Sequence, residues 1–431
     1  MLETDVKTGQ YMDPAQRLQR QLELLQATIN RAHGTVPFYK NRFMENRAEP
    51  SSVESLDSIG RLPFTYRKDL AEHYPYGLFA VPLRDIVRIH TAPGLGVHPV
   101  VSGYTRQDLV IWREIATRAL STAGLGASDI LQICLDPGLA NWGRDYKDAA
   151  EALGASVIPL TSLSMEKQRM ILADYKTSVL STTPTFAVQL MNTLLASGVN
   201  PNELALRTLV LAGEPLTPET RQALEEGLHL TAWSHYGLSE VPGPGLAFEC
   251  EEHHGLHLSE DHFLAEIVDP ASGTPVPEGE EGELTLTTLT TRAFPLIRFR
   301  TGDRMRLIPE PCPCGRTLRR VQWLPGRLDD TVLIRGVKVH QDQILSHMSR
   351  VLSLVPRHFR FRPVRGETAS GLEVWLGVDN DVFSDEVKIL EGRVQAVSAA
   401  LSQELGVPVS VRLKETTQMG PENQKWMPEA L

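Results

Sequence analysis

The stretch His235-Tyr236-Gly237-Leu238-Ser239-Glu240 organises the interpretation of the whole chain. It follows an apolar run at residues 206–211 and a segment with helical spacing at 217–227, so we expect it at the end of a strand. A carboxylate there, after a Tyr-Gly turn and a hydroxyl, can hold a divalent cation against a phosphate while the tyrosine stacks on a base. The pattern is short, and taken alone it would also fit an ordinary turn.

Upstream of this stretch, apolar runs alternate with helix-like segments. Strands are expected at residues 130–135, 156–160, 178–181 and 206–211, and helices at 139–153, 165–175 and 184–196. Such alternation predicts a largely parallel sheet with helices on both faces. Ligands of these sheets gather beyond the carboxyl ends of the strands, which is where Tyr236 to Glu240 would lie.

Downstream, the pattern changes after Glu260. Antiparallel strands are expected at residues 265–268, 282–289, 298–307 and 321–324. Beyond residue 330 we expect a helix from about 342, strands at 358–363, 372–377 and 407–413, and a long helix at 384–405. The fold class is therefore α/β, with a large N-terminal domain of mixed and parallel sheets (1–329) and a small C-terminal α+β domain (330–431).

The N-terminal part should begin with a packing helix. Asp13-Pro14-Ala15-Gln16 has the residue types of a helix start. Leu18, Leu22, Leu25 and Ile29 then fall on one face, and Gly34 ends the run.

Composition excludes several classes of protein. The chain has 431 residues, a formal charge of −10 and 42% hydrophobic residues, which is typical of a globular protein and unlike a general nucleic-acid binder. No apolar run is long enough for a membrane span, and the first ten residues are too polar for a signal peptide. Four cysteines make no disulfide framework in a chain of this length, so the compartment that we predict is the cytoplasm.

Three of the four cysteines lie in two short turns that are rich in metal-ligand residues. Cys250 and His257 belong to the first turn, and Cys312 and Cys314 to the second. Thiolates and an imidazole at these spacings suit a closed, tetrahedral zinc site within residues 250–314. The other reading is two unrelated cysteine turns, and His254 is an alternative to His257 as the fourth ligand.

Several further motifs follow Tyr236 to Glu240 in a fixed order. They are Gly243-Pro244-Gly245, Gly255-Leu256-His257, Arg300-Thr301-Gly302-Asp303 and Gly326-Arg327-Leu328-Asp329-Asp330, with Pro63-Phe64-Thr65-Tyr66-Arg67-Lys68-Asp69-Leu70 upstream. Together they resemble the phenylacetate–coenzyme A ligase family of adenylate-forming enzymes, over nearly the whole chain. The resemblance implies that an N-terminal domain binds nucleotide and acyl group and that a mobile C-terminal domain pivots at Asp329.

The same resemblance implies roles for individual residues. Glu214 and Pro215 would form the nucleotide-base loop, Tyr236 and Gly237 would flank the adenine, and Ser239 would contact a phosphate. Glu240 would hold Mg²⁺, Asp303 would accept both ribose hydroxyls, and Arg327 would contact ribose or phosphate. Tyr146 would lie near the acyl pocket, and Lys425 would reach the acyl carboxylate and the α-phosphate.

One segment departs from the family. Between His90 and Gly103-Tyr104-Thr105 the family has a phosphate loop rich in Ser, Thr and Gly with a lysine, whereas this chain has Ala92-Pro93-Gly94-Leu95-Gly96-Val97-His98-Pro99. Backbone amides around the glycines could still bind an anion. The missing hydroxyls and lysine should cost several kcal/mol of transition-state stabilisation.

Two functions therefore compete. The first is an enzyme that converts a carboxylic acid to an acyl-adenylate with ATP and transfers the acyl group to coenzyme A; the resemblance implies an aromatic acid. The second is a binding protein that keeps the nucleotide and acyl pockets and has lost efficient ATP chemistry. The intact Glu240, Asp303 and Arg327 favour the enzyme. A homodimer is one candidate assembly, and the sequence does not decide the oligomeric state.

Overall fold

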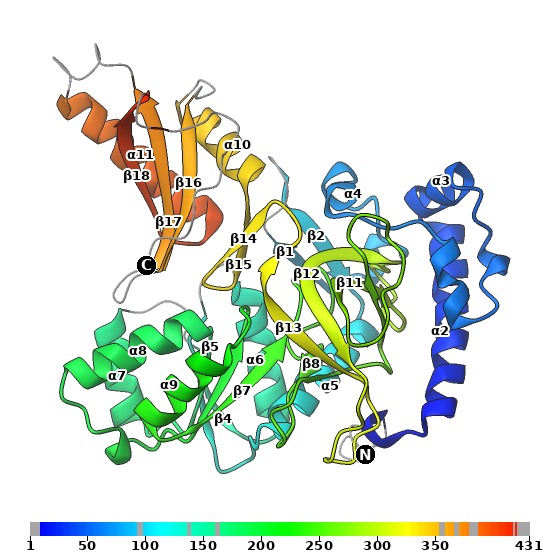
Figure 1. Ribbon diagram of the computed structural model, residues 1–431, viewed down its shortest axis with the longest axis horizontal. Coiled ribbons are helices and arrows are strands. Elements are labelled where there is room, and N and C mark those ends of the chain that lie inside the picture. Colours follow the sequence, from blue (N-terminus) through cyan, green and yellow to red (C-terminus); the bar gives the residue numbers. More distant parts are fainter. Residues whose placement is uncertain are drawn as a thin grey trace.

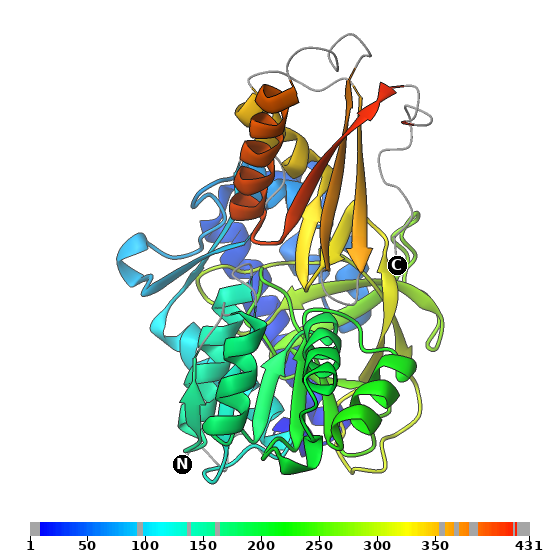
Figure 2. The same cartoon turned by 90° about the vertical axis from the view of Figure 1, so that its left-hand side faces the viewer.

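The computed structural model describes residues 9–92, 98–135, 139–159, 164–352, 358–365, 370–378, 387–416 and 419 (Figure 1). The N-terminal part is built around one large sheet, and a smaller sheet with two helices lies at one end of the molecule (Figure 2). No helix within the described ranges has the length and apolar character needed to cross a membrane.

Eleven strands form the large sheet, in the order β10-β11-β12-β13-β9-β8-β7-β6-β5-β3-β4. The parallel half comprises β3 (Ile130–Ile133), β4 (Ser156–Ile158), β5 (Val179–Thr182), β6 (Thr208–Ala212) and β7 (Thr231–Tyr236). The antiparallel half comprises β8 (Ala247–Phe248), β9 (Leu256–Leu258), β10 (Phe263–Val268), β11 (Glu281–Thr288), β12 (Phe299–Ile308) and β13 (Arg320–Arg327). The predicted mixed α/β architecture is confirmed.

The burial of strand β6 on both faces explains why the strands of the parallel half appear in the sequence as continuous apolar runs. Leu209 and Leu211 pack into one core with helices α7 (Met165–Asp174), α8 (Pro184–Ala196) and α9 (Pro218–Leu228). Val210 and Ala212 point to the opposite face and pack with α5 (Arg106–Thr122) and α6 (Ala140–Ala152). A strand that is covered on both faces has no polar side, so alternation disappears.

The N-terminal helix α2 (Pro14–Thr35) begins as expected, because the Asp13 side chain accepts hydrogen bonds from the amides of Ala15 and Gln16. Leu25 and Ile29 are fully buried, but Leu18 is 54% exposed, so its assignment to the packing face was wrong. Near the start of α2 the buried side chains are polar. Arg17 donates to the carbonyl of Thr317 at 2.6 Å and Gln21 to the carbonyl of Glu260 at 2.8 Å, because α2 crosses loops rather than an apolar surface there.

The remaining N-terminal elements are short. They include α3 (Pro37–Glu45), α4 (Arg67–Glu72), several short 3-10 helices and a two-stranded hairpin of β1 (Arg88–Ala92) and β2 (Val100–Tyr104). The segment that departs from the family joins β1 to β2, and its residues 93–97 lie outside the described part of the chain.

The C-terminal part starts with a hairpin, β14 (Thr331–Ile334) and β15 (Val337–His340), followed by α10 (Gln341–Leu352). Strands β16 (Phe359–Arg365), β17 (Ser370–Val378) and β18 (Val409–Glu415) form the second sheet, with α11 (Val387–Leu405) against it. The strands and helices expected beyond residue 330 are therefore present, and the start expected for the last helix, residue 384, falls outside the described residues.

Two glycines bring the hairpin against the large sheet. A Cβ atom on Gly213 would lie 3.0 Å from the Cα of Gly336, and one on Gly336 would lie 2.8 Å from a methyl carbon of Leu139. Both residues also have positive φ angles, +89° and +79°, which side-chain-bearing residues rarely adopt. The turn of the hairpin therefore rests directly on the loop that follows β6.

Candidate active site

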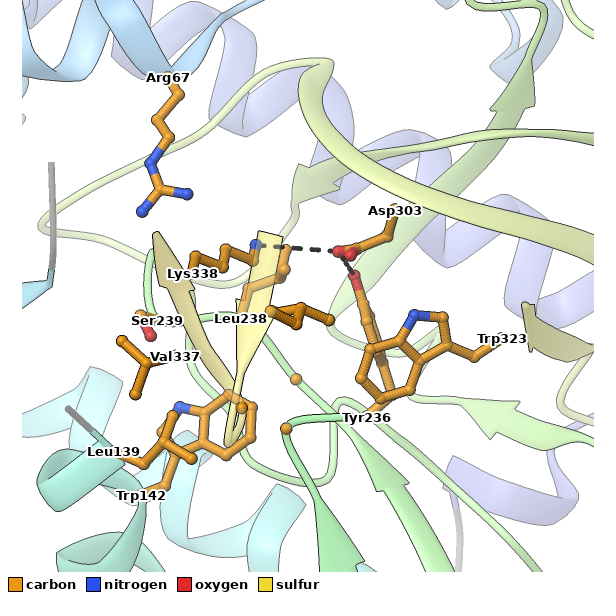
Figure 3. A pocket seen from close by; sticks show the side chains of 14 residues that line it. Arg67, Leu139, Trp142, Tyr236, Leu238, Ser239, Asp303, Trp323, Val337 and Lys338 are labelled. Atoms are coloured by element: carbon orange, nitrogen blue, oxygen red, sulfur yellow. Dashed lines mark hydrogen bonds and ion pairs between the residues drawn. The ribbon is translucent and has the colours of Figure 1, made fainter. Parts of the chain in front are cut away.

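A narrow cavity lies where strand β7 ends and the β14–β15 hairpin meets the large sheet (Figure 3). The free space within it is about 20 Å³, enough for about one water molecule. The residues that line it are Arg67, Leu139, Trp142, Gly213, Tyr236, Gly237, Leu238, Ser239, Asp303, Trp323, Leu333, Gly336, Val337 and Lys338. Four of the predicted nucleotide-site residues, Tyr236, Gly237, Ser239 and Asp303, are thus brought together at the carboxyl end of a parallel strand.

Asp303 is the centre of a buried polar network. It lies on β12 directly opposite Arg327 of β13, and this register explains the ion pair between Arg327 and the Oδ1 atom of Asp303. The hydroxyl of Tyr236 donates to Oδ2 of Asp303 at 2.7 Å. Burial, together with the nearby Asp303 carboxylate, raises the pKa of Tyr236 well above its ordinary value, so this hydroxyl stays protonated.

The carboxylate of Glu240 is buried, and neither of its oxygens has a hydrogen-bond partner. Arg67, at the start of α4, lies 3.6 Å from one oxygen. Burial by itself raises the pKa of Glu240, but Lys338 and Arg67 outweigh it, and the pKa lies below the ordinary value. A buried, ionised carboxylate whose oxygens accept no hydrogen bond is a fitting ligand for a hard divalent cation.

Lys338 enters the cavity from strand β15. Its ammonium lies 3.8 Å from Oδ2 of Asp303, and in Figure 3 the side chain points along the cavity toward that carboxylate. Burial lowers the pKa of Lys338, although the nearby Glu240 and Asp303 carboxylates oppose this effect. Lys338 is therefore close enough to both of the acids that the sequence singled out for their charges to affect its pKa.

The predicted base loop, Glu214 and Pro215, lies beside this cavity rather than in its lining. The Glu214 carboxylate accepts hydrogen bonds from the amide and hydroxyl of Thr185, at 2.9 and 2.6 Å, and from the amide of Gly336 at 3.0 Å. Both residues line a larger cleft of about 570 Å³ that also reaches Arg327. Glu214 thus ties the hairpin to the sheet.

Tyr146 is fully buried on α6, and its hydroxyl lies 2.9 Å from Nδ1 of His235. It does not line the narrow cavity; Trp142, from the same helix, does. Lys425 and loop residues 93–97 lie outside the described residues, whereas His98, at the loop's end, stacks on Tyr74 with ring centres 4.6 Å apart.

The cysteine turns converge on one point. The ligand atoms of Cys250, His257, Cys312 and Cys314 all lie within 4.8 Å of one another, with Cys250 and Cys312 sulfurs 3.5 Å apart. Strand β13 pairs with β9, and Arg320 lies opposite His257. This pairing places the turn between β12 and β13, which holds Cys312 and Cys314, next to the turn that holds Cys250 and His257.

The His257 ring is oriented for this group. Its Nδ1 lies 3.1 Å from the carbonyl of Leu318 and its Nε2 lies 3.4 Å from the Cys314 sulfur. Burial lowers the pKa of His257 to about 4, which keeps the ring neutral. His254 instead contacts Arg320. Three sulfurs and one oriented imidazole nitrogen fit tetrahedral zinc.

A second cluster of acids and histidine, Glu114, Asp261 and His262, has a different explanation. The buried Arg118 donates to both oxygens of Asp261, at 2.9 and 2.5 Å, and to Glu114 at 3.2 Å. The positive charge that these carboxylates need is already supplied by arginine.

Sequence reasoning missed Lys338, Arg67 and the aromatic walls Trp142 and Trp323. Arg67 belongs to a segment that resembles the family, but in the sequence it is only a residue in the first turn of a short helix, and nothing there indicates that it reaches the cavity. Lys338 sits in an alternating strand pattern, where a lysine ordinarily faces solvent. Only the fold of the hairpin onto the sheet reveals it.

Comparison with known proteins agrees with this site. A family model described as "AMP-binding enzyme" matches residues 150–290. The chain is 38% identical to a phenylacetate–coenzyme A ligase of Thermus thermophilus over 405 residues, covering 92% of this chain and 91% of that protein. It is also 38% identical to the phenylacetate–coenzyme A ligase of Escherichia coli, covering 80% of this chain and 79% of that protein.

A solved structure of 2-hydroxyisobutyryl-CoA ligase with its adenylate and CoA, in the thioesterification state, matches with a TM-score of 0.88 at 24% identity, covering 98% of this chain and 91% of that one. The fold and the AMP-binding match define an adenylate-forming protein. The extent and identity of the curated matches go further: the chain belongs to the phenylacetate–coenzyme A ligase family.

Proposed function

We propose that this protein is an AMP-forming acid–thiol ligase that activates an aromatic carboxylic acid with ATP and transfers the acyl group to coenzyme A. The observation that carries the proposal is the convergence of Tyr236, Ser239 and Asp303 in one cavity, with Glu240 buried close by. The family membership supports both half-reactions, and the names of the relatives support phenylacetate as the first acid to test.

In this proposal each residue has a defined task. Asp303 accepts the two ribose hydroxyls, Arg327 orients Asp303 and contacts ribose or phosphate, and Tyr236 with Gly237 flanks the adenine. Glu214 and Pro215 border the base, Ser239 contacts a phosphate, Tyr146 lies near the acyl pocket, and Lys425 reaches the acyl carboxylate. The buried ion pair of Asp303 with Arg327 supports a rigid site, because groups held in place need no reorganisation during the reaction.

Two metal ions belong to the proposal. Mg²⁺ would be held by Glu240, and when bound it would neutralise negative charge on the phosphates of ATP. The carboxylate oxygens of Glu240, which have no hydrogen-bond partner, support that role. Zn²⁺ would be held by Cys250, His257, Cys312 and Cys314 and would tie the two turns together as a structural ion.

We assign residues 1–329 to the nucleotide- and acyl-binding domain and residues 330–431 to a domain that pivots at Asp329. Residues 328–330 lie between the end of β13 and the start of β14, which supports a hinge there. The arrangement described here matches the 2-hydroxyisobutyryl-CoA ligase in its thioesterification state with a TM-score of 0.88. The match falls to 0.70 for the postadenylation state and to 0.69 for an open conformation. This difference supports an arrangement suited to thiol transfer.

The binding-protein alternative rested on the segment from Ala92 to Pro99, and the relatives at 36–38% identity favour the enzyme. The test is pyrophosphate release from ATP with a panel of aryl acids, with and without coenzyme A. We expect the wild type to turn over with at least one acid, and restored Ser, Thr and Lys residues in the loop to help little. Pyrophosphate release only by the restored variant would favour the alternative.

We also propose the cytoplasm as the compartment: none of the four cysteines, all of which lie within the described residues, forms a disulfide bond, and disulfides are rare in a reducing compartment. A homodimer, which the sequence leaves open, is tested by sedimentation of the purified protein.

A further inference from the structure

Arg67 faces the carboxylate that we assign to a divalent cation. Its guanidinium lies 3.6 Å from Oε1 of Glu240, and in Figure 3 its side chain is directed into the narrow cavity. The side chains of Arg67 and Glu240 are 12% and 1% exposed, so water and salt screen this ion pair only weakly. The distance exceeds that of a hydrogen bond, so the guanidinium balances the charge of the carboxylate without using its acceptor positions.

The backbone around Arg67 is held firmly in place. Thr65 pairs with strand β12 through hydrogen bonds to the carbonyl of Arg298 at 3.1 Å and from the amide of Arg300 at 2.9 Å. The Asp69 carboxylate accepts a hydrogen bond from the amide of the residue that precedes Arg67, at 2.7 Å, and so fixes the start of α4. Arg67 therefore reaches Glu240 from a backbone that is anchored to the large sheet.

Several positive charges act on Glu240 at once. Burial raises the pKa of its carboxyl, but the charges of Lys338, Arg67 and Arg327 oppose burial and hold the pKa below its ordinary value. A single carboxylate that faces several cations has little negative charge left to attract a free divalent ion. A Mg²⁺ ion at about 2.1 Å from a Glu240 oxygen would also lie close to the Arg67 guanidinium, and like charges in a buried site repel each other strongly.

ATP changes this balance in the proposed reaction, because its phosphates bring further negative charge to the same metal ion. Mg²⁺ is usually held by one or two carboxylates together with the phosphates of a substrate. We infer that Arg67 is a positioning residue that acts through Glu240: its pairing with that carboxylate keeps free divalent cations out, so that Mg²⁺ binds at Glu240 only together with the phosphates of ATP. The inference rests on the proposed function, in which Glu240 is the Mg²⁺ ligand, and deepens it by making metal binding depend on the nucleotide.

The experiment uses Mn²⁺ as the probe ion and measures its binding to the purified protein without nucleotide, by calorimetry and electron paramagnetic resonance. We expect the wild type to bind Mn²⁺ weakly or not at all, and Arg67→Met to bind it at least about tenfold more tightly, because a buried positive charge beside the carboxylate is removed. Arg67→Lys, which keeps the charge, should stay close to wild type. Glu240→Gln, added to Arg67→Met, should abolish the gain, since the gained ion binds at Glu240. A purely structural role of Arg67 predicts no gain in any variant.

Lys68→Met is the matched control, because Lys68 is the next residue of α4, is exposed, and lies over the Tyr66 ring at 5.7 Å, outside the cavity lining. Its affinity for Mn²⁺ should equal that of the wild type. Arg67→Gln provides a second neutral variant if the methionine variant does not fold. Equal Mn²⁺ affinity in the wild type and the neutral variants, or a gain that survives Glu240→Gln, would overturn the assignment.

A measurement with ATP present separates this assignment from the proposed function. The relaxation of water protons distinguishes Mn²⁺–ATP on the protein from Mn²⁺–ATP in solution, and we expect the enhanced relaxation in the wild type to be lost in Glu240→Gln. If the wild type shows no enhancement, Glu240 is not the metal ligand, and that part of the proposed function fails together with the inference. If the enhancement is present but the wild type binds Mn²⁺ without ATP as tightly as Arg67→Met does, the inference alone fails.

Discussion

The guanidinium of Arg327 donates two hydrogen bonds to the carboxylate of Asp329, from Nε to Oδ1 at 2.8 Å and from Nη2 to Oδ2 at 2.6 Å. Arg327 also pairs with Asp303, so one side chain joins the buried nucleotide-site acid to the proposed hinge. The nearby guanidinium outweighs burial and lowers the pKa of Asp329 to about 2.

This link predicts that the hinge pair stabilises the docked hairpin. Asp329→Asn keeps the shape of the side chain but removes its charge, and Asp329 is partly exposed, so we expect a loss of about 1 kcal/mol. Thioester formation from a preformed adenylate should slow by about fivefold, which is the rate equivalent of that energy. Asp330→Asn, on the exposed neighbouring residue, serves as the control, and a rate equal to wild type in both variants would contradict the role of the pair.

Asp303→Ala should weaken nucleotide binding. The substitution removes both acceptors for the ribose hydroxyls and leaves Arg327 without its buried partner. We expect the affinity for AMP, measured by calorimetry, to fall by about tenfold or more, equivalent to at least about 1.4 kcal/mol. Tyr236→Phe, which loses only the hydroxyl, should cost less. If the wild type itself does not bind AMP, the assignment of this nucleotide site is wrong.

Zinc should copurify with the protein at about one ion per chain, as measured by elemental analysis after washing with a chelator. Cys314→Ala should lower the metal content and the melting temperature together, because binding of the ion is coupled to local folding. Cys134→Ala is the matched control, since Cys134 is a buried thiol in the core of the parallel half. A fully folded, metal-free wild type would rule the site out.

Acid should destabilise the fold through His235. Burial lowers the pKa of His235 from 6.5 to about 4, so the unfolded chain takes up a proton at higher pH than the folded chain does. The free energy of unfolding should therefore fall as the pH decreases from about 6.5 to about 4, by about 3 kcal/mol for this group.

His235→Gln should flatten the pH dependence in that window, as measured by urea unfolding at a series of pH values. His33→Gln, at a histidine of α2 that is not fully buried, is the control. The slopes are compared rather than the absolute stabilities, because the variant also loses the contact with Tyr146. An unchanged slope in His235→Gln would contradict the prediction.

The sequence allowed the regular parts of the fold to be predicted because their patterns are local. Strand β6 and helix α8 each carry their own signal, a continuous apolar run in one case and a capping threonine with proline in the other. Strands β8 and β9 have two and three residues, too few to show a period. The prediction for Leu18 was wrong because periodicity shows which residues share a face of a helix, but not how far along the helix that face is covered by other elements.

The site was predictable where a motif names its residues and unpredictable where the fold brings distant residues together. Asp303 and Arg327 were named by sequence, and the register of β12 with β13 joins them. The position of Lys338 depends on a hairpin folding back across the end of β7, which no spacing within the chain encodes. Glu214 was assigned to the base loop, but its bond to the amide of Gly336 could be found only in three dimensions.

The contact between Gly213 and Gly336 makes the docked hairpin sensitive to a single methyl group. An alanine at Gly213 would place a carbon 3.0 Å from the Cα of Gly336, and one at Gly336 would place a carbon 2.8 Å from Leu139 and 3.2 Å from the Cα of Gly213. These contacts are tighter than nearly all real side-chain contacts, so the two segments would have to move apart. The hairpin would then stop short of the sheet, and Lys338 with it. Such a chain would keep all the residues of its nucleotide site, so we expect it to bind AMP while its hairpin is displaced from the sheet.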